Sequence, residues 1–117
     1  MEPHHWILDE HKQPMKVSLM EWAKWMEKRE RVVKQEWIGD TWVSTVFLGL
    51  DHNFDEGGPP ILWESMAFSN RKDLNNDMLR CAGSWEQAEA MHERMVLHVC
   101  EVEGINLATA RSQREPT

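Results

Sequence analysis

Two strand-like segments joined at a glycine constrain the fold of this chain more than any other feature. Residues 31–38 and 42–50 are rich in β-branched and aromatic side chains, and Gly39-Asp40 lies between them. A two-residue connection that begins with glycine is typical of the type II′ turn of a β-hairpin. The sequence therefore predicts two neighbouring antiparallel strands.

The register of this hairpin follows from its short turn. It pairs Trp37 with Trp42 and Val33 with Val46, and such cross-strand pairs stabilise a hairpin. Alternate residues of the second strand share a face, and both faces carry apolar groups, so we expect a central strand covered at least in part on both sides. The two sets are Trp42, Val46, Leu48 and Leu50 on one face, and Val43, Thr45 and Phe47 on the other.

Further strands are indicated on both sides of the hairpin. Short apolar runs at residues 5–8 and 15–17 flank a polar segment and predict a small β element. Residues 51–60 form a loop with the breakers Gly57-Gly58 and Pro59-Pro60. Residues 61–68 and 78–82 predict two more strands after it.

Two segments show helix signals. Ser18 with Glu21 forms a capping box before a helix at about residues 19–29, whose apolar stripe is Leu19, Trp22, Ala23 and Met26 and leaves Trp25 to one side. Ser84 with Gln87 forms a second capping box, and Gly104 is the expected stop of that helix.

The order of these elements predicts an α+β fold. An antiparallel meander of about four strands, with a short N-terminal β element, carries two packed helices. A length of 117 residues indicates one domain, which we place at residues 1–104. We expect residues 105–117 to form a flexible C-terminal tail, because little apolar content follows Leu107.

The formal charge of −7 is distributed unevenly. Residues 37–110 hold twelve acidic and four basic side chains, whereas residues 24–36 mix both signs and indicate a solvated surface. An acidic body of this kind argues against direct nucleic-acid binding, which needs clustered Lys and Arg. Mean hydropathy is −0.62 and no apolar run reaches the length of a membrane span, so we expect no membrane segment.

The cysteines and histidines predict no metal site and no cofactor. Cys81 and Cys100 form no CxxC motif, and the first ten residues lack a secretory pattern, so we expect free thiols in a reducing compartment. The acidic stretch that begins at Asp51 fails as an EF-hand, because Glu56 and Leu62 occupy the positions that require Gly and Glu.

Four polar residues could form a small-ligand or metal site, with hydrolysis as one outcome. They are Asp51, His52, Glu64 and His92. A histidine next to a carboxylate can perform general acid–base chemistry. The alternative is structural, with His92 as a core histidine, Glu64 facing solvent opposite Trp63, and His52 shaping its loop.

The aromatic composition suggests a binding surface. The chain has seven Trp, eight Met and no Tyr. Four of the tryptophans, Trp6, Trp25, Trp63 and Trp85, cannot all be fully buried in so small a domain, and exposed Trp residues often anchor interfaces. We take Trp25, Trp63 and Trp85 as candidate binding residues; the alternative is that several are simply half-buried.

Three segments carry a resemblance to a known group of proteins. They are residues 42–54, WVSTVFLGLDHNF, residues 59–68, PPILWESMAF, and residues 84–92, SWEQAEAMH. This pattern resembles a group of small, uncharacterised proteins of tailed bacteriophages, over about residues 23–99. Met91 departs from it, because the group often has a small residue there, and residues 69–81 match poorly.

The resemblance implies a phage protein in the cytoplasm of an infected bacterium, without implying a mechanism. Together with the Trp and Met content and the acidic charge, it predicts a non-enzymatic binding protein that modulates a host or defence protein and that can self-associate. The alternative is the ligand or metal site around Asp51, His52, Glu64 and His92. A third hypothesis is that the acidic side chains imitate nucleic acid.

Overall fold

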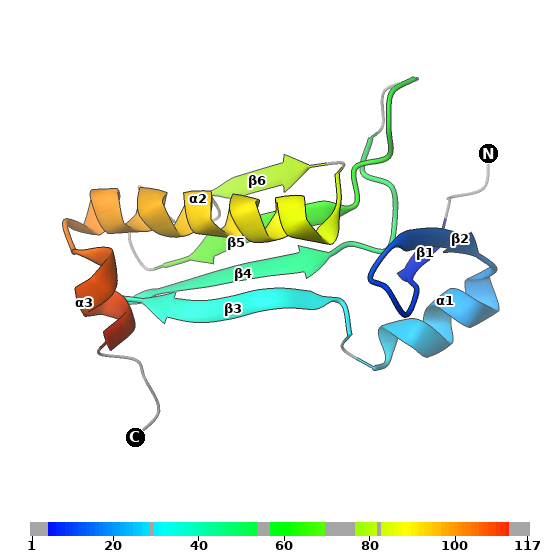
Figure 1. The fold of residues 1–117 in the computed structure, drawn as a ribbon, viewed down its shortest axis with the longest axis horizontal. Coiled ribbons are helices and arrows are strands. Elements are labelled where there is room, and N and C mark those ends of the chain that lie inside the picture. The colour runs from blue at the N-terminus through cyan, green and yellow to red at the C-terminus, as the bar shows by residue number, and fades with distance from the viewer. Residues whose placement is uncertain (1–4, 29, 54–56, 70–76, 82, 113–117) are drawn as a thin grey trace.

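The computed structural model describes residues 5–28, 30–53, 57–69, 77–81 and 83–112. It confirms the α+β fold (Figure 1). In chain order the elements are β1 (His5–Leu8), β2 (Pro14–Val17), α1 (Leu19–Met26), β3 (Val32–Ile38), β4 (Thr41–Phe47), β5 (Trp63–Phe68), β6 (Met78–Cys81), α2 (Trp85–Glu103) and α3 (Leu107–Ser112).

The main sheet is an antiparallel meander in the order β3-β4-β5-β6. The hairpin turn is confirmed, because Gly39 has φ 58° and Trp37 pairs with Trp42. The expected pair of Val33 with Val46 is wrong. A bulge between Val32 and Lys34 inserts one residue, so Val32 pairs with Val46 instead.

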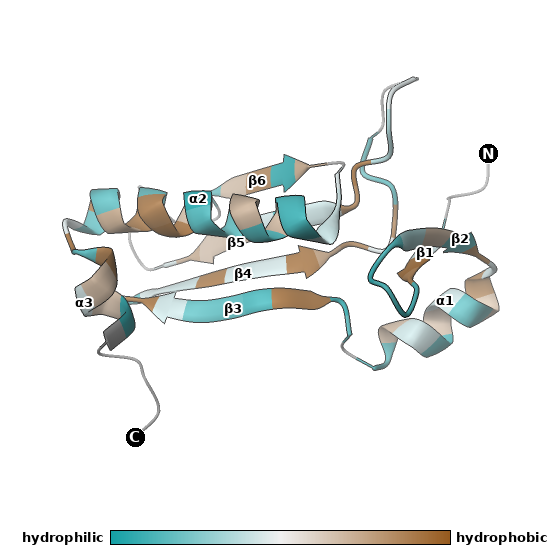
Figure 2. Cartoon of the chain, viewed as in Figure 1, coloured by the Kyte–Doolittle hydropathy of each residue, from teal (hydrophilic) through white to brown (hydrophobic). Residues whose placement is uncertain are grey.

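One helix covers one face of this sheet. Figure 1 shows α2 running along the strands, and it contacts β3, β4, β5 and β6. Figure 2 shows hydrophobic and hydrophilic residues alternating along this helix. The inward-facing side chains of β4 are fully buried against it, whereas the outward-facing ones are only half-buried. β4 lies between β3 and β5, so the prediction of a central strand is confirmed. No described helix covers its second face, where the side chains are half-buried.

The caps of α2 follow the sequence. Ser84 accepts a hydrogen bond from the backbone N–H of Gln87, whose side chain bonds back to the Ser84 backbone. Gly104 ends the helix with φ 68°.

The buried face of α1 differs from the predicted stripe. Trp25 is only 7% exposed and packs edge-on against Phe47, whereas Leu19 is 58% exposed. Of the predicted stripe, Trp22 and Met26 are half-buried and Ala23 is exposed, and the helix ends at Met26 instead of about residue 29. The small β1–β2 sheet beside it joins the end of β4 through the bond from the Trp6 backbone N–H to the Gly49 carbonyl, 2.8 Å long.

The expected C-terminal tail begins instead with a packed helix. In α3, Ala110 is buried in the core that contains Ile38, Val43 and Val99. The prediction of a tail that begins at residue 105 is therefore wrong for residues 105–112, because short apolar side chains and Arg111 bind this segment to the sheet. Residues 113–117 lie outside the described part of the chain.

Replacing Gly49 with alanine should destabilise the fold more than replacing Gly104. Both glycines have positive φ, 76° and 68°, which costs an L residue about 1–2 kcal/mol. At Gly49 the new Cβ would also lie 2.8 Å from Trp22 Nε1 and 3.2 Å from Met26 Sδ, whereas at Gly104 it meets nothing. In urea titrations we expect Gly49→Ala to lower the free energy of unfolding by ~1–3 kcal/mol more than Gly104→Ala does. Equal losses in the two variants would contradict the close packing of α1 on this loop.

Candidate functional site

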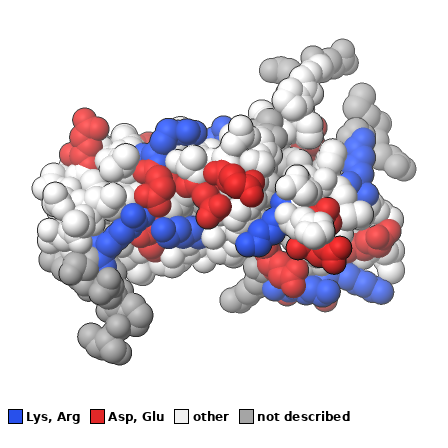
Figure 3. Space-filling view, viewed as in Figure 1, with Lys and Arg blue, Asp and Glu red and all other residues white. Residues whose placement is uncertain are grey.

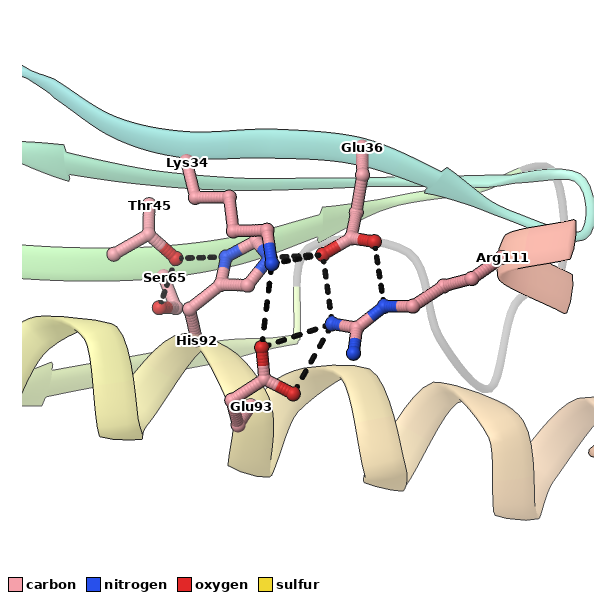
Figure 4. Close-up of polar contacts among 7 residues, drawn as sticks. All are labelled: Lys34, Glu36, Thr45, Ser65, His92, Glu93 and Arg111. Atoms are coloured by element: carbon pink, nitrogen blue, oxygen red, sulfur yellow. Dashed lines mark hydrogen bonds and ion pairs between the residues drawn. The ribbon is translucent and has the colours of Figure 1, made fainter. Parts of the chain in front are cut away.

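A chain of hydrogen bonds crosses the buried interface between the sheet and α2 (Figure 4). Ser65 Oγ and Thr45 Oγ1 lie 2.5 Å apart, and Thr45 Oγ1 lies 2.6 Å from His92 Nδ1. On the other side of the ring, His92 Nε2 lies 2.7 Å from a carboxylate oxygen of Glu36. Ser65, Thr45 and His92 have no exposed surface, so these groups depend on one another for hydrogen bonds.

The strand register explains how these residues meet. Thr45 pairs directly with Ser65 across β4 and β5, and both point toward α2. Lys34 pairs with Thr45 on the other side, and Glu36 follows two residues later on the same face of β3. His92 lies on the buried stripe of α2, with Met91 and Met95 as neighbours.

The ionised carboxylate of Glu36 determines which atoms carry the protons in this series of hydrogen bonds. Burial raises the pKa of Glu36, but hydrogen bonds from Arg111 and His92 and the charge of Lys34 outweigh burial and lower it to about 2. An ionised carboxylate only accepts hydrogen bonds, so His92 Nε2 carries the proton. Burial lowers the pKa of His92 below its ordinary value, which keeps the ring neutral. Nδ1 then accepts from Thr45, and Thr45 accepts from Ser65.

A cluster of ion pairs, which we call the ionic layer, surrounds Glu36 at the outer end of this series of hydrogen bonds. Arg111 of α3 donates from Nε and Nη2 to the two oxygens of Glu36, at 3.0 and 3.1 Å. The same Nη2 lies 2.8 Å from Glu93 of α2, and Lys34 Nζ lies 3.5 Å from Glu93. The hydrogen bonds to Glu36 and Glu93 raise the pKa of Arg111. The ionic layer thus connects β3, α2 and α3.

The chemistry of this network is structural. A hydroxyl, a histidine and a carboxylate in series have the residue types of a nucleophilic triad. Here, however, both hydroxyls and the ring are fully buried, and none of the described pockets is lined by them. A nucleophile must reach its substrate, so the geometry supports a neutral hydrogen-bonded link between sheet and helix.

The four residues of the ligand-site hypothesis do not form one cluster. Glu64 lies on the face of the sheet opposite His92, where it accepts a 2.8 Å bond from Arg80. Asp51 accepts bonds from the backbone N–H groups of Asn53 and Ile61, at 2.7 and 2.9 Å.

His52 has a similar local role. Its Nδ1 lies 2.9 Å from the Leu50 carbonyl. Asp51 and His52 therefore both bond to the backbone of the loop after β4, and for His52 this is the role that the structural alternative gave. In the described part of the chain no group of His, Cys, Asp and Glu could hold a metal ion.

Two of the three candidate binding tryptophans belong to the core. Trp25 is 7% exposed, and Trp63 is fully buried with its indole N–H donating to the Gly83 carbonyl at 2.7 Å. Both rings pack against Phe47. Because both side chains are buried, they cannot act as exposed anchors. Trp85 is half-buried, with Lys12 Nζ 4.2 Å from its ring centre.

Other apolar side chains gather on the uncovered side of the sheet. The register places Trp37, Trp42 and Phe68 in one row and Met66 and Met78 in the next row of the same face. We call these five residues the open face. Trp37, Phe68 and Met78 are 45%, 42% and 45% exposed, and the Trp37 and Trp42 rings pack with their centres 5.3 Å apart.

Sequence reasoning missed most of these residues for identifiable reasons. Glu36, Glu93 and Arg111 look like ordinary solvated charges, and their contacts join residues up to 75 positions apart. The signal that could have found Thr45 is its alternation with Val43 and Phe47, which places a polar side chain on the same face as two apolar ones. The pairing of Trp37 with Trp42 was predicted correctly. The hairpin sequence does not show which face of the sheet α2 covers, so their exposure could not be predicted.

The charges seen beside α2 are mixed. Figure 3 shows Lys and Arg interspersed with Asp and Glu over α1 and along α2, instead of one acidic tract. On this face the chain does not resemble the regular negative charge of nucleic acid. None of the described helices has the length and apolar character needed to cross a membrane.

Comparisons of this chain with protein-family models, with curated proteins and with solved structures found no match.

Acid should destabilise the protein through His92. The pKa of this ring is lowered by folding, so the unfolded chain binds a proton more readily. The stability from His92 is present above its ordinary pKa of 6.5 and is lost as the pH falls from 6.5 toward the lowered value. Glu36 acts in a separate window, between its ordinary pKa of 4.5 and about 2.

This effect can be isolated with His92→Gln, which can still donate and accept hydrogen bonds but does not titrate. We expect the free energy of unfolding of the original protein to fall more steeply than that of the variant between pH 7.5 and 5, in urea titrations. The remaining histidines are common to both proteins and cancel. Parallel curves would show that His92 is not held neutral by the fold.

Removing Arg111 should loosen α3 and destabilise the protein. Arg111→Leu leaves Lys34, 3.6 Å from Glu36 and 3.5 Å from Glu93, as the one described cation shared by these two carboxylates. Because the cluster is partly solvated, we expect a loss of about 1–2 kcal/mol in unfolding free energy and faster hydrogen exchange in α3. Arg80→Leu, which breaks a single pair with Glu64, is the control and should cost less than about 1 kcal/mol. An Arg111→Leu variant with unchanged exchange in α3 would contradict the role of this contact.

Proposed function

We propose that this chain is a non-enzymatic binding protein and that its open face binds an apolar, uncharged surface of another protein. The observation that supports this most directly is the exposure of Trp37, Phe68 and Met78 beside Trp42 and Met66 on a sheet face that no described helix covers. Contiguous exposed apolar surface of this kind marks interaction sites.

The residue types on this face suit an interface. Trp and Phe supply large contact area with few rotatable bonds, and Met adapts to an irregular partner. Trp37 and Trp42 also hold each other in place. A partner therefore meets rings that are already ordered, which lowers the entropic cost of binding.

The charge of the face defines the chemistry of the partner. The neighbouring Glu64 and Arg80 pair with each other at 2.8 Å, and Gln35 bonds to Ser44 at 2.8 Å. The open face is thus electrically neutral on a chain whose formal charge is −7. A partner that meets it needs apolar surface and no compensating charge.

The biological setting of the proposal comes from the sequence pattern alone. The resemblance to small proteins of tailed bacteriophages suggests that the partner is a host or defence protein in an infected bacterium. The exposed side chains of the open face support the choice of binding surface, and the resemblance supports the choice of an infected bacterium as the setting.

A charged substitution in the open face should abolish partner binding. We expect Phe68→Glu to weaken the complex at least 100-fold, because it buries an unpaired carboxylate. The matched control is Leu97→Glu on α2, because Leu97 is 55% exposed and lies outside the open face; it should change affinity less than about twofold. A photo-crosslinking amino acid at position 68 or 97 identifies the partner in the infected cell, and calorimetry with the purified partner measures affinity.

Three outcomes would contradict the proposal. The first is a folded Phe68→Glu variant, judged by circular dichroism, that binds as well as the original protein. The second is crosslinking that is equal at positions 68 and 97. The third is a purified chain that is a dimer in light scattering and becomes monomeric with Phe68→Glu, because a second copy would then occupy the open face.

A further inference from the structure

Strand β6 is an edge of the sheet in the described part of the chain. It pairs with β5, and no described strand lies on its other side. The Ala67 backbone N–H donates to the Asp77 carbonyl, so by the alternation of antiparallel strands Leu79 and Cys81 also direct their backbone groups toward β5. Met78 and Arg80 therefore direct theirs outward, where an added strand could bind them.

A groove runs between this edge and α2. It consists of two hollows of about 430 and 330 Å³. The larger one is lined by Asp77, Met78, Leu79, Arg94, Met95 and His98. The smaller one is lined by Cys81, Gly83, Gln87, Ala90 and Arg94. Arg94 belongs to both, so it stands between the two hollows.

The groove combines apolar walls with a cation, Arg94, that has no partner among the described residues. Met78, Leu79 and Met95 give the larger hollow its apolar walls. At one end His98 Nε2 pairs with Asp77 at 2.8 Å. Arg94 has no ion-pair or hydrogen-bond partner among the described residues. In a chain of net charge −7, a guanidinium that no described carboxylate pairs, placed between two hollows, favours a carboxylate ligand.

We propose that the groove between β6 and α2 binds an extended peptide segment of a partner protein, which adds to β6 as a fifth strand. Hydrogen bonds from the peptide backbone to the Met78 and Arg80 backbone groups fix the register of the peptide on β6. The peptide side chains that point toward α2 determine specificity. One acidic side chain pairs with Arg94, and an apolar side chain two residues away enters the hollow beside Met95, because alternate residues of a strand share a face.

The shape of the groove selects an internal segment over a chain terminus. Hollows lie on both sides of Arg94, so a bound chain continues past it in both directions. The four residues of β6 span about 13 Å, which matches four or five residues of extended peptide. The expected pattern is apolar–any–acidic, or its reverse, within such a segment.

This proposal uses a different part of the molecule from the open face, except for Met78, which belongs to both. The peptide contacts the edge of the sheet and the flank of α2, whereas the proposed partner surface lies on the outer side of the sheet. Phe68→Glu should therefore leave peptide binding unchanged, and Arg94→Gln should leave the binding of the open face unchanged. Failure of one proposal can be told from failure of the other.

The test uses random seven-residue peptides displayed inside a carrier protein, so that none has a free C-terminus, selected against the full chain. We expect enrichment of the apolar–any–acidic pattern in either direction. A synthetic, end-blocked peptide from the selection should slow hydrogen exchange at the Met78 and Arg80 backbone amides. Arg94→Gln should weaken its binding about tenfold or more, whereas Glu89→Gln, at an exposed position of α2 outside the groove, should not.

Several results would overturn the proposal. One is a selection that enriches no such pattern, and another is a bound peptide that leaves exchange at Met78 and Arg80 unchanged. A third is equal affinity of the original protein and Arg94→Gln. Octanoate, an apolar carboxylate without a peptide backbone, would indicate a small-molecule pocket if it displaced the peptide at similar affinity. Concentration-dependent protection of Met78 and Arg80 without peptide would show that a second copy fills the edge.

Discussion

The burial of one sheet face, mainly under α2, is the constraint on which the rest of this structure depends. That face contains Thr41, Thr45 and Ser65 among its apolar residues, and all three are fully buried. Buried hydroxyls need partners, and α2 provides them: Glu103 accepts from Thr41 at 2.8 Å, and His92 lies within hydrogen-bond distance of Thr45. The polar side chains of α2 therefore fix where this helix sits along the sheet.

The same constraint explains the position of α3. Glu36 is held ionised beside a buried ring, and its charge requires a cation. Arg111 supplies this cation from a helix that otherwise contributes few large apolar groups. In this way a segment with little hydrophobic content becomes ordered, since its guanidinium satisfies two carboxylates at once.

A single covering helix also leaves surfaces available for binding. The outer side of the sheet keeps its aromatic and methionine side chains in contact with solvent, and the edge at β6 keeps its backbone groups. The proposed partner binds the outer side of the sheet, and the proposed peptide binds the edge at β6. Neither needs a catalytic group, and in the hydrogen-bonded series of Ser65, Thr45 and His92 both hydroxyls and the ring are fully buried.

Local signals in the sequence predicted local structure well. The turn at Gly39-Asp40, the capping box at Ser84 and the stop at Gly104 depend on a few neighbouring residues, and the structure confirms all three. Errors arose where the answer depended on distant residues. The bulge at Val33 shifts the expected register, and Trp25 is buried because Phe47, far along the chain, lies opposite it.

The sequence by itself determined the strands, their order in the meander and the apolar stripe of α2, because alternation, helical periodicity and turn chemistry act over short distances. Only the tertiary structure decided which face of the sheet α2 covers. That choice buried His92 with Thr45 and separated it from Glu64. It also left Trp37 and Phe68 exposed, and it ordered α3 through Arg111. These outcomes depend on contacts between residues far apart in the chain, and such contacts leave no periodic signal in the sequence.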